Sequence, residues 1–136
     1  MSEAIGKNIL AIVHYDAIGR TLERIFERSG CAIEVIESAV DASEEVRDRL
    51  GELLADVVIT DWSGVNGAGI VKVAQEKGVK TIIIMDGGLM KDEEREKFRK
   101  SGAADIVPKP FDVEKLIDLV KRDKIEEALQ TDNSES

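Results

Sequence analysis

The sequence lacks the disulfides, long apolar segments and leader-like start that are typical of secreted and membrane-bound proteins. Cys31 is the single cysteine among 136 residues, which excludes an internal disulfide framework. The apolar runs reach only about five residues, too short for a transmembrane helix, and no basic segment followed by an apolar stretch begins the chain. We therefore expect a soluble, cytoplasmic protein without a membrane partner.

The chain also lacks an excess of basic residues. The chain has 19 lysines and arginines against 28 acidic residues, for a formal net charge of -9. Duplex DNA and anionic membranes are bound through an excess of lysine and arginine, so we expect no nucleic-acid partner. The length fits one domain that buries enough surface to fold without a metal. We assign residues 1–130 to that domain and residues 131–136 to a disordered tail.

Five apolar segments alternate with five amphipathic ones, which is typical of an α/β protein with a parallel sheet. The first, third and fourth apolar segments are almost continuously hydrophobic, as strands covered on both faces are, so the second and fifth are expected at the edges. Right-handed crossovers then favour the order 2-1-3-4-5, a flavodoxin-like doubly wound (βα)5 three-layer sandwich. The predicted strands are 8–13, 32–37, 56–60, 80–85 and 104–107, and the predicted helices are 17–29, 42–54, 67–77, 91–101 and one capped by Asp112.

Polar side chains follow the predicted strands at the edge where ligands bind in such sheets. This edge is formed by the carboxyl ends of the strands, near the point where the winding direction changes. A carboxylate placed where a buried strand ends is costly unless it has partners. The candidate residues are His14, Tyr15 and Asp16 after the first strand, Asp61 after the third, Asp86 after the fourth and Lys109 after the fifth.

Over residues 7–125 the sequence resembles the receiver domain of response regulators of the chemotaxis-regulator type. The resemblance rests on Asp61, on Gly69 eight residues later, and on the stretch SGAADIVPKPF from Ser101 to Phe111. It implies a phosphorelay in two-component signal transduction, in which a histidine kinase transfers a phosphoryl group to the aspartate matching Asp61 with the help of Mg²⁺. It also implies a surface near the fourth helix, fifth strand and fifth helix that changes shape.

The metal-binding positions depart from this family pattern. Receivers carry two acidic residues after the first strand, and this chain has His14 and Tyr15 there. An alignment shifted by one residue places Val13 and His14 at the same positions, and Asp16 is the only nearby acid. Mg²⁺ prefers octahedral oxygen ligands, so imidazole and phenol are poor replacements. We therefore expect impaired Mg²⁺-dependent phosphorylation and no resident cofactor.

The phosphoryl-binding side of the pocket is changed as well. Asp61 and Lys109 are kept, but Asp86 stands where the family has a serine or threonine, and Ile106 stands where an aromatic residue reports the change. Two unit negative charges about 5 Å apart repel each other by roughly 3 kcal/mol at an effective dielectric near 20, so a carboxylate at Asp86 would disfavour a phosphoryl group on Asp61. Asp61 and Asp86 can instead share the ammonium group of Lys109 in a structural salt-bridge network.

We interpret the chain as a stand-alone atypical receiver that acts through protein–protein contacts and not as an enzyme, since no output domain follows the last predicted helix. The expected partner is a signalling protein, with a histidine kinase as one candidate. The expected contact face carries Lys91, Arg95 and Arg99, one helical turn apart, beside Ile106.

Two alternatives stay open. In the first, Asp16, Asp61 and Asp86 form a rewired acidic pocket that binds Mg²⁺ and supports an aspartyl phosphate. In the second, the flavodoxin-like scaffold binds a small molecule or cofactor, because MDGG at 85–88 has a glycine pair similar to that of cobalamin-binding domains. The Asp-x-His-x-x-Gly signature of those domains is missing, and no glycine-rich phosphate loop follows the first strand.

Overall fold

The computed structural model describes residues 5–14, 16–86, 91–101, 104–109 and 111–122. The side chains of residues 16, 17, 86, 99, 101 and 104, the residue at 15 and the predicted tail at 131–136 lie outside this description. The strands are β1 (Asn8–Val13), β2 (Ala32–Glu37), β3 (Val57–Asp61), β4 (Lys80–Asp86) and β5 (Ala104–Lys109). The helices are α1 (Asp16–Arg28), α2 (Ser43–Glu52), α3 (Gly67–Glu76), α4 (Asp92–Ser101) and α5 (Val113–Lys121).

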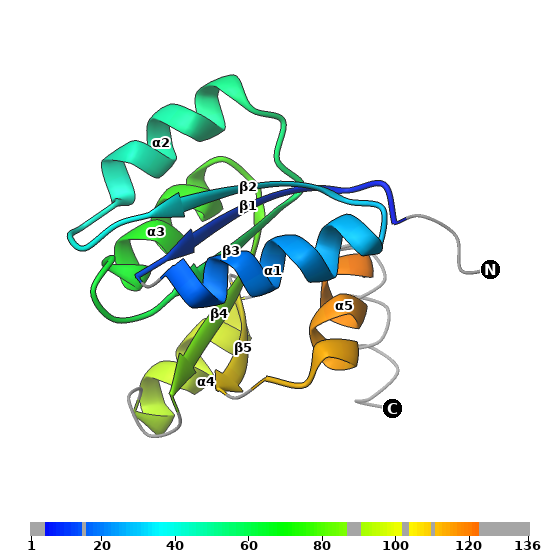
Figure 1. The fold of residues 1–136 in the computed structure, drawn as a ribbon. Helices are drawn as coiled ribbons and strands as arrows, with labels where there is room; N and C mark the ends of the chain where they lie inside the picture. The colour runs from blue at the N-terminus through cyan, green and yellow to red at the C-terminus, as the bar shows by residue number, and fades with distance from the viewer. Residues whose placement is uncertain (1–4, 15, 87–90, 102–103, 110, 123–136) are drawn as a thin grey trace.

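The strands form one parallel sheet in the order β2-β1-β3-β4-β5 (Figure 1). This confirms the predicted flavodoxin-like fold, with β2 and β5 at the edges. The register pairs Asp61 with Ile84, and Asp86 with Lys109. The carboxyl ends of β3, β4 and β5 therefore lie next to one another at one edge of the sheet.

The helices cover both faces of the sheet, with α1 and α5 on one face and α2 and α3 on the other (Figure 1). Successive side chains of a strand point to opposite faces, so β1 serves both. Ile9 and Val13 pack with Phe26 of α1, while Leu10 packs with Val46 of α2. Both layers are buried, which explains why β1 is almost continuously apolar.

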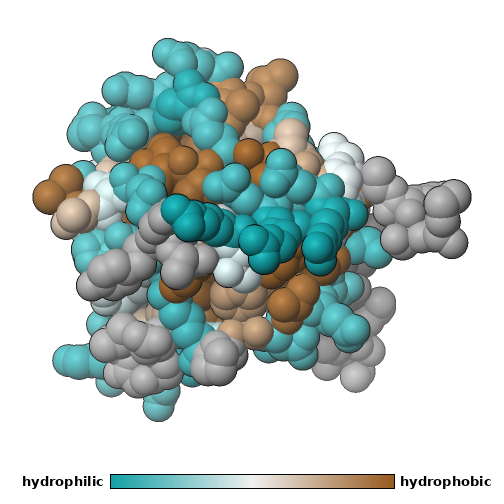
Figure 2. Space-filling view, viewed as in Figure 1, coloured by the Kyte–Doolittle hydropathy of each residue, from teal (hydrophilic) through white to brown (hydrophobic). Residues whose placement is uncertain are grey.

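The exposed surface is mainly polar. Figure 2 shows hydrophilic side chains over much of the face presented there. Among the described residues, the large hydrophobic side chains that stay exposed are Val40, Leu54 and Val113. No helix in the described part of the chain is long and apolar enough to span a bilayer.

The sequence predicted one helix cap correctly and another wrongly. Asp112 accepts hydrogen bonds from two backbone amides in the first turn of α5, as expected. Asp41 and Glu44 have the spacing of a capping box for the predicted helix 42–54, but the N-cap residue of α2 is Ala42, which makes no side-chain cap bond. Asp41 instead accepts from the amide and hydroxyl of Ser43, at 2.9 and 2.7 Å, and from the side-chain amide of Asn66 at 3.0 Å. Asp41 therefore ties two loops together.

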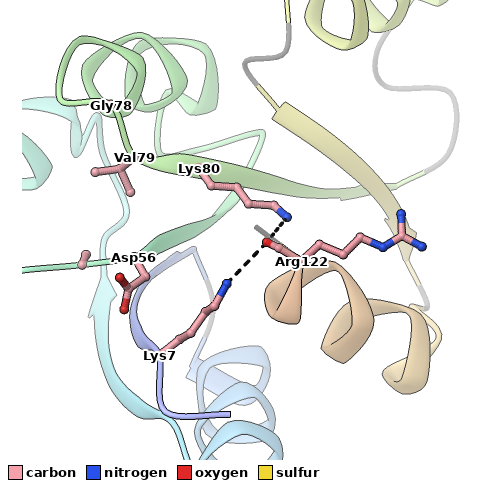
Figure 3. Close-up of a pocket in the computed structure, with 7 residues that line it drawn as sticks. Lys7, Asp56, Gly78, Val79, Lys80 and Arg122 are labelled. Carbon is pink, nitrogen blue, oxygen red and sulfur yellow. Dashed lines mark hydrogen bonds between the residues drawn. The ribbon is translucent and has the colours of Figure 1, made fainter. Parts of the chain in front are cut away.

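Two lysines fasten the end of α5 to the amino edge of the sheet. Lys80 Nζ donates to the carbonyl oxygens of Leu119 and Arg122, at 2.5 and 3.1 Å. Lys7 Nζ donates to those of Lys121 and Arg122, at 3.2 and 3.4 Å. Figure 3 shows both ammonium groups converging on the Arg122 carbonyl, beside a pocket of about 250 Å³. The last carbonyls of a helix lack intrahelical donors and carry partial negative charge, so these cations stabilise the helix end.

We expect Lys80→Met to lower the free energy of unfolding by about 2 kcal/mol, because charge-assisted hydrogen bonds to α5 are lost while the apolar stem is kept. Lys80 is only 7% exposed, so water cannot easily replace its ammonium group. Urea denaturation measures the change. Lys72→Met, at an exposed position of α3, is the matched control. Equal losses in the two variants would contradict the anchoring role.

Candidate functional site

Asp61 lies at the end of β3 and is only 4% exposed. Its Oδ1 atom accepts a hydrogen bond from Lys109 Nζ at 2.5 Å, and its Oδ2 atom accepts one from the backbone N–H of His14 at 2.8 Å. A buried carboxylate is costly unless such partners are present. Both oxygens of Asp61 are therefore engaged, one by a side chain of β5 and the other by the backbone just after β1.

Lys109 reaches Asp61 from the far side of β4. It is the last residue of β5, and its side chain is 23% exposed. Asp86 is its register partner on β4, but the Asp86 side chain lies outside the described residues. The same holds for the side chain of Asp16. Their predicted shares in a salt-bridge network or a rewired acidic pocket stay predictions.

The imidazole of His14 lies between two loops of the carboxyl edge. Its Nδ1 atom is 3.1 Å from the carbonyl oxygen of Ser38, which can only accept, so Nδ1 is the donor. A Cβ atom added to Gly64 would lie 2.6 Å from this Nδ1. Gly64 also has a φ of +85°, which favours glycine. The ring of His14 thus fills the space under the β3–α3 loop and links it to the β2–α2 loop.

The two loops around this imidazole are also joined directly. The amide of Ala42 donates to the carbonyl of Val65 at 3.0 Å, in addition to the Asp41–Asn66 hydrogen bond. Bonds from the hydroxyl and amide of Ser43, with that from Asn66, hold the pKa of the Asp41 carboxyl below its ordinary value. The folding stability that these hydrogen bonds contribute is present above the ordinary pKa of the carboxyl, and it is lost as the pH falls through the lowered pKa.

The start of α3 presses closely on the Asp61 loop. The Gly67 amide donates to the Trp62 carbonyl at 3.0 Å, and a Cβ atom at Gly67 would lie 2.7 Å from both Asp61 O and Trp62 Cα. Asn66 caps α3 with a φ of 60°, its side chain accepting from the amide of Gly69. A Cβ at Gly69 would collide with that same side chain, which explains its glycine. Sequence reasoning missed Asn66 and Gly67, for which the only signal is the dense run of glycines.

The predicted contact face on α4 is arranged differently from a simple exposed stripe. Lys91 is exposed, whereas Arg95 is partly buried, and its Nε atom is buried without a hydrogen-bond partner among the described residues. The side chain of Arg99 lies outside the description. Ile106 is 8% exposed and belongs to a buried cluster with Val71, Ile83 and Met85. Ile106 can therefore influence a surface only through the helix that covers it.

The described side chains do not form a site for Mg²⁺. One oxygen of Asp61 faces an ammonium group, and the other faces a peptide N–H. The imidazole of His14 donates to a carbonyl and would be a poor ligand for so hard an ion. Within the described residues there is no group of three or more His, Cys, Asp or Glu side chains placed to hold a metal.

The family model of the response regulator receiver domain matches residues 10–121 of this sequence. The chain belongs to this family. It is therefore a receiver domain of two-component signalling, a class of signalling modules whose members commonly bind Mg²⁺ when active and interact with partners such as kinases. The sequence-based resemblance is thereby confirmed.

Solved receiver structures have the same fold. The receiver domain of Francisella response regulator 1452 gives a TM-score of 0.69 at 23% identity, covering 85% of this chain and 93% of that one. The Vibrio cholerae chemotaxis protein CheY4 gives 0.71 at 20% identity, covering 86% and 98%. A two-component response regulator from Clostridium difficile gives 0.69 at 19% identity, covering 85% and 93%. No curated protein sequence matched the chain.

We expect Lys109→Met to lower the free energy of unfolding by about 3 kcal/mol, because it leaves the Asp61 carboxylate of this receiver buried without its cation. Asp61→Asn should cost less, since the amide oxygen can still accept from the His14 amide and Lys109 is free to extend toward water. Urea denaturation of both variants and of the double variant gives the coupling energy. Additive losses in the double variant would show that the two side chains do not depend on each other.

We expect Gly64→Ala to destabilise the domain more than Gly78→Ala. Both glycines have positive φ, at +85° and +72°, so each alanine carries a backbone cost of about 1–2 kcal/mol. Only the alanine at 64 also meets the His14 ring, which adds about 1–3 kcal/mol of overpacking. Thermal unfolding in the presence and absence of His14→Ala separates the two costs. The proposed packing is wrong if His14→Ala leaves the Gly64→Ala penalty undiminished.

Proposed function

We propose that this receiver domain signals through protein–protein contacts with Asp61 held by Lys109, and that Mg²⁺-dependent phosphorylation of Asp61 is impaired. The observation that supports this most directly is the engagement of both Asp61 oxygens, by an ammonium group at 2.5 Å and a peptide N–H at 2.8 Å. Charge-assisted hydrogen bonds of this kind stabilise a buried carboxylate without a metal.

The surroundings of His14 support the same conclusion. At a position where the family places an acidic metal ligand, the side chain is an imidazole that donates to the carbonyl of Ser38 and fills the space under Gly64. Its contacts join two loops, which is a structural task. The pocket is thus organised by hydrogen bonds and packing around one ion pair.

We place the contact face on α4 and the residue before it, where Lys91, Arg95 and Arg99 follow one another at intervals of four residues. The buried position of Ile106 makes it a support for this helix and not a contact residue. The partner is a signalling protein, with a histidine kinase as one candidate, and the domain acts as a cytoplasmic interaction module and not as an enzyme.

We expect no saturable change in Trp62 fluorescence when millimolar Mg²⁺ and then beryllofluoride, a phosphoryl mimic, are added. Trp62 is the only tryptophan and is adjacent to Asp61, so its emission reports on the pocket. A site that lacks its acidic ligands should bind Mg²⁺ weakly. Asp61→Asn, which cannot accept a phosphoryl group, is the matched control and should give the same flat titration.

Saturable quenching that disappears in Asp61→Asn would overturn this proposal and favour the rewired acidic pocket of Asp16, Asp61 and Asp86. The contact face is checked with the same preparations by comparing the proteins they retain. The double variant Arg95→Ala/Arg99→Ala should lose the partner that wild type retains. Arg47→Ala, on α2, serves as an arginine-to-alanine control away from that face.

A further inference from the structure

An aromatic contact joins the loop at Asp61 directly to α4. Trp62, the residue after Asp61, meets Phe98 edge to face, with ring centroids 5.6 Å apart and planes at 80°. Edge-to-face contact is a favoured geometry for aromatic rings. Trp62 belongs to the candidate site and Phe98 to the helix that carries the proposed contact face. The pair is thus a physical link between the two.

Trp62 is fastened to the candidate site by its backbone. The hydroxyl of Thr60 donates to the carbonyl of Asp61 at 2.8 Å, and the amide of Gly67 donates to the carbonyl of Trp62 at 3.0 Å. A Cβ atom at Gly67 would lie 2.7 Å from the Trp62 Cα atom and 3.0 Å from its ring. A close-packed contact of this kind passes a displacement on, because it has no free space to absorb one.

At the other end of the link, α4 has few apolar anchors. Of its side chains that the structure describes, all except Arg95 and Phe98 are exposed. A short, highly charged helix depends on the packing of its apolar face for stability. Phe98 and Trp62 pack together against the buried cluster that contains Ile106. The position of α4 therefore depends on the ring of Trp62.

The seam under α4 also contains an unsatisfied group. The Nε atom of Arg95 is buried and has no hydrogen-bond partner among the described residues. A buried donor without a partner raises the free energy of the arrangement that contains it. A shifted position of α4 that opens this atom to water would recover that cost. The unsatisfied donor therefore lowers the cost of shifting the helix.

We propose that Trp62 transmits the state of the Asp61–Lys109 ion pair to α4 through Phe98. Residue 106 is an isoleucine and residue 86 an aspartate. This chain therefore has neither an aromatic ring at 106 nor a hydroxyl at 86 that could carry a change from the Asp61 pocket to α4. Loss or exchange of the Lys109 contact shifts the loop, Trp62 moves against Phe98, and the outer face of α4 changes. Trp62 is a positioning residue, and its importance for signalling rests on the proposed function of that face.

A double-mutant cycle with amide hydrogen exchange tests this relay. Asp61→Asn, which removes the negative charge of the ion pair, is compared with wild type in the Phe98 and the Phe98→Leu backgrounds. Exchange is followed in peptides covering 92–101 of α4 and 43–52 of α2. Asp56→Asn is the matched control, because it makes the same chemical change just before the other end of β3. Emission of Trp62 is recorded for every protein.

We expect Asp61→Asn to change exchange in α4 by about threefold or more when Phe98 is present and by much less when Phe98 is leucine. Exchange in α2 should not respond, and Asp56→Asn should leave α4 unchanged. The emission of Trp62 should shift with Asp61→Asn in both backgrounds, because Trp62 stands before Phe98 in the relay. Trp62→Phe, which keeps a ring, should retain part of the response of α4, and Trp62→Leu should remove it.

An equal response of α4 in both Phe98 backgrounds would overturn the relay, as would an α4 that does not respond to Asp61→Asn at all. These readouts need no partner protein, so they separate the relay from the proposed function. A responsive α4 in a protein that binds no partner through that helix would refute the function and leave the relay standing. A partner bound through an unresponsive α4 would do the reverse.

Discussion

The ion pair of Asp61 and Lys109 is the contact on which the carboxyl edge of the sheet depends. It joins β3 to β5 over the end of β4, the strand between them. The registers place Asp61 level with Ile84 and Val107, so the side chain of Lys109 reaches back from two residues further along β5. A carboxylate that is 4% exposed needs a cation at this spot, and the cation is supplied from across the sheet. The loops that contain His14 and Trp62 therefore pack beside a carboxylate whose position is fixed by its two hydrogen bonds.

At the opposite edge of the sheet, lysine ammonium groups bind neutral carbonyl oxygens and not a carboxylate. There the ammonium groups of Lys7 and Lys80 hold the carbonyl end of α5. Although the chain has a formal net charge of -9, these lysines lie beside carbonyl oxygens at the end of a helix that have no intrahelical donor. Lys80 and Lys109 thus each connect their strand to another element of this receiver domain from a buried or partly buried position.

Most of the fold could be predicted because hydrophobic patterning follows burial. The bounds of β1 and β2 were predicted without error, and those of β3 and β4 to within one residue. The failures have local causes. The fifth strand was predicted as 104–107, but β5 continues through Pro108 to Lys109, because an edge strand tolerates proline. The apolar stripe of α2 was extended to Leu54, yet the helix ends at Glu52, and Leu54 is 87% exposed.

The candidate site was only partly accessible from the sequence. Topology alone was enough to place Asp61 and Lys109 at one edge. The roles of Gly64 and Gly67 depend on atoms from distant segments that approach their backbones, and no spacing in the sequence records such an approach. The same limit concealed the turn of the His14 ring toward Ser38 and the burial of Ile106 under α4.

The packing of His14 has a consequence for how this pocket could change during evolution. An acidic residue at position 14 would leave the carbonyl of Ser38 without its donor and would open a void under Gly64. Such a substitution would therefore need compensating changes in the two loops that the His14 ring joins, near Ser38 and Gly64. Such mutual dependence couples the residue that position 14 can carry to the residues that these two loops can carry.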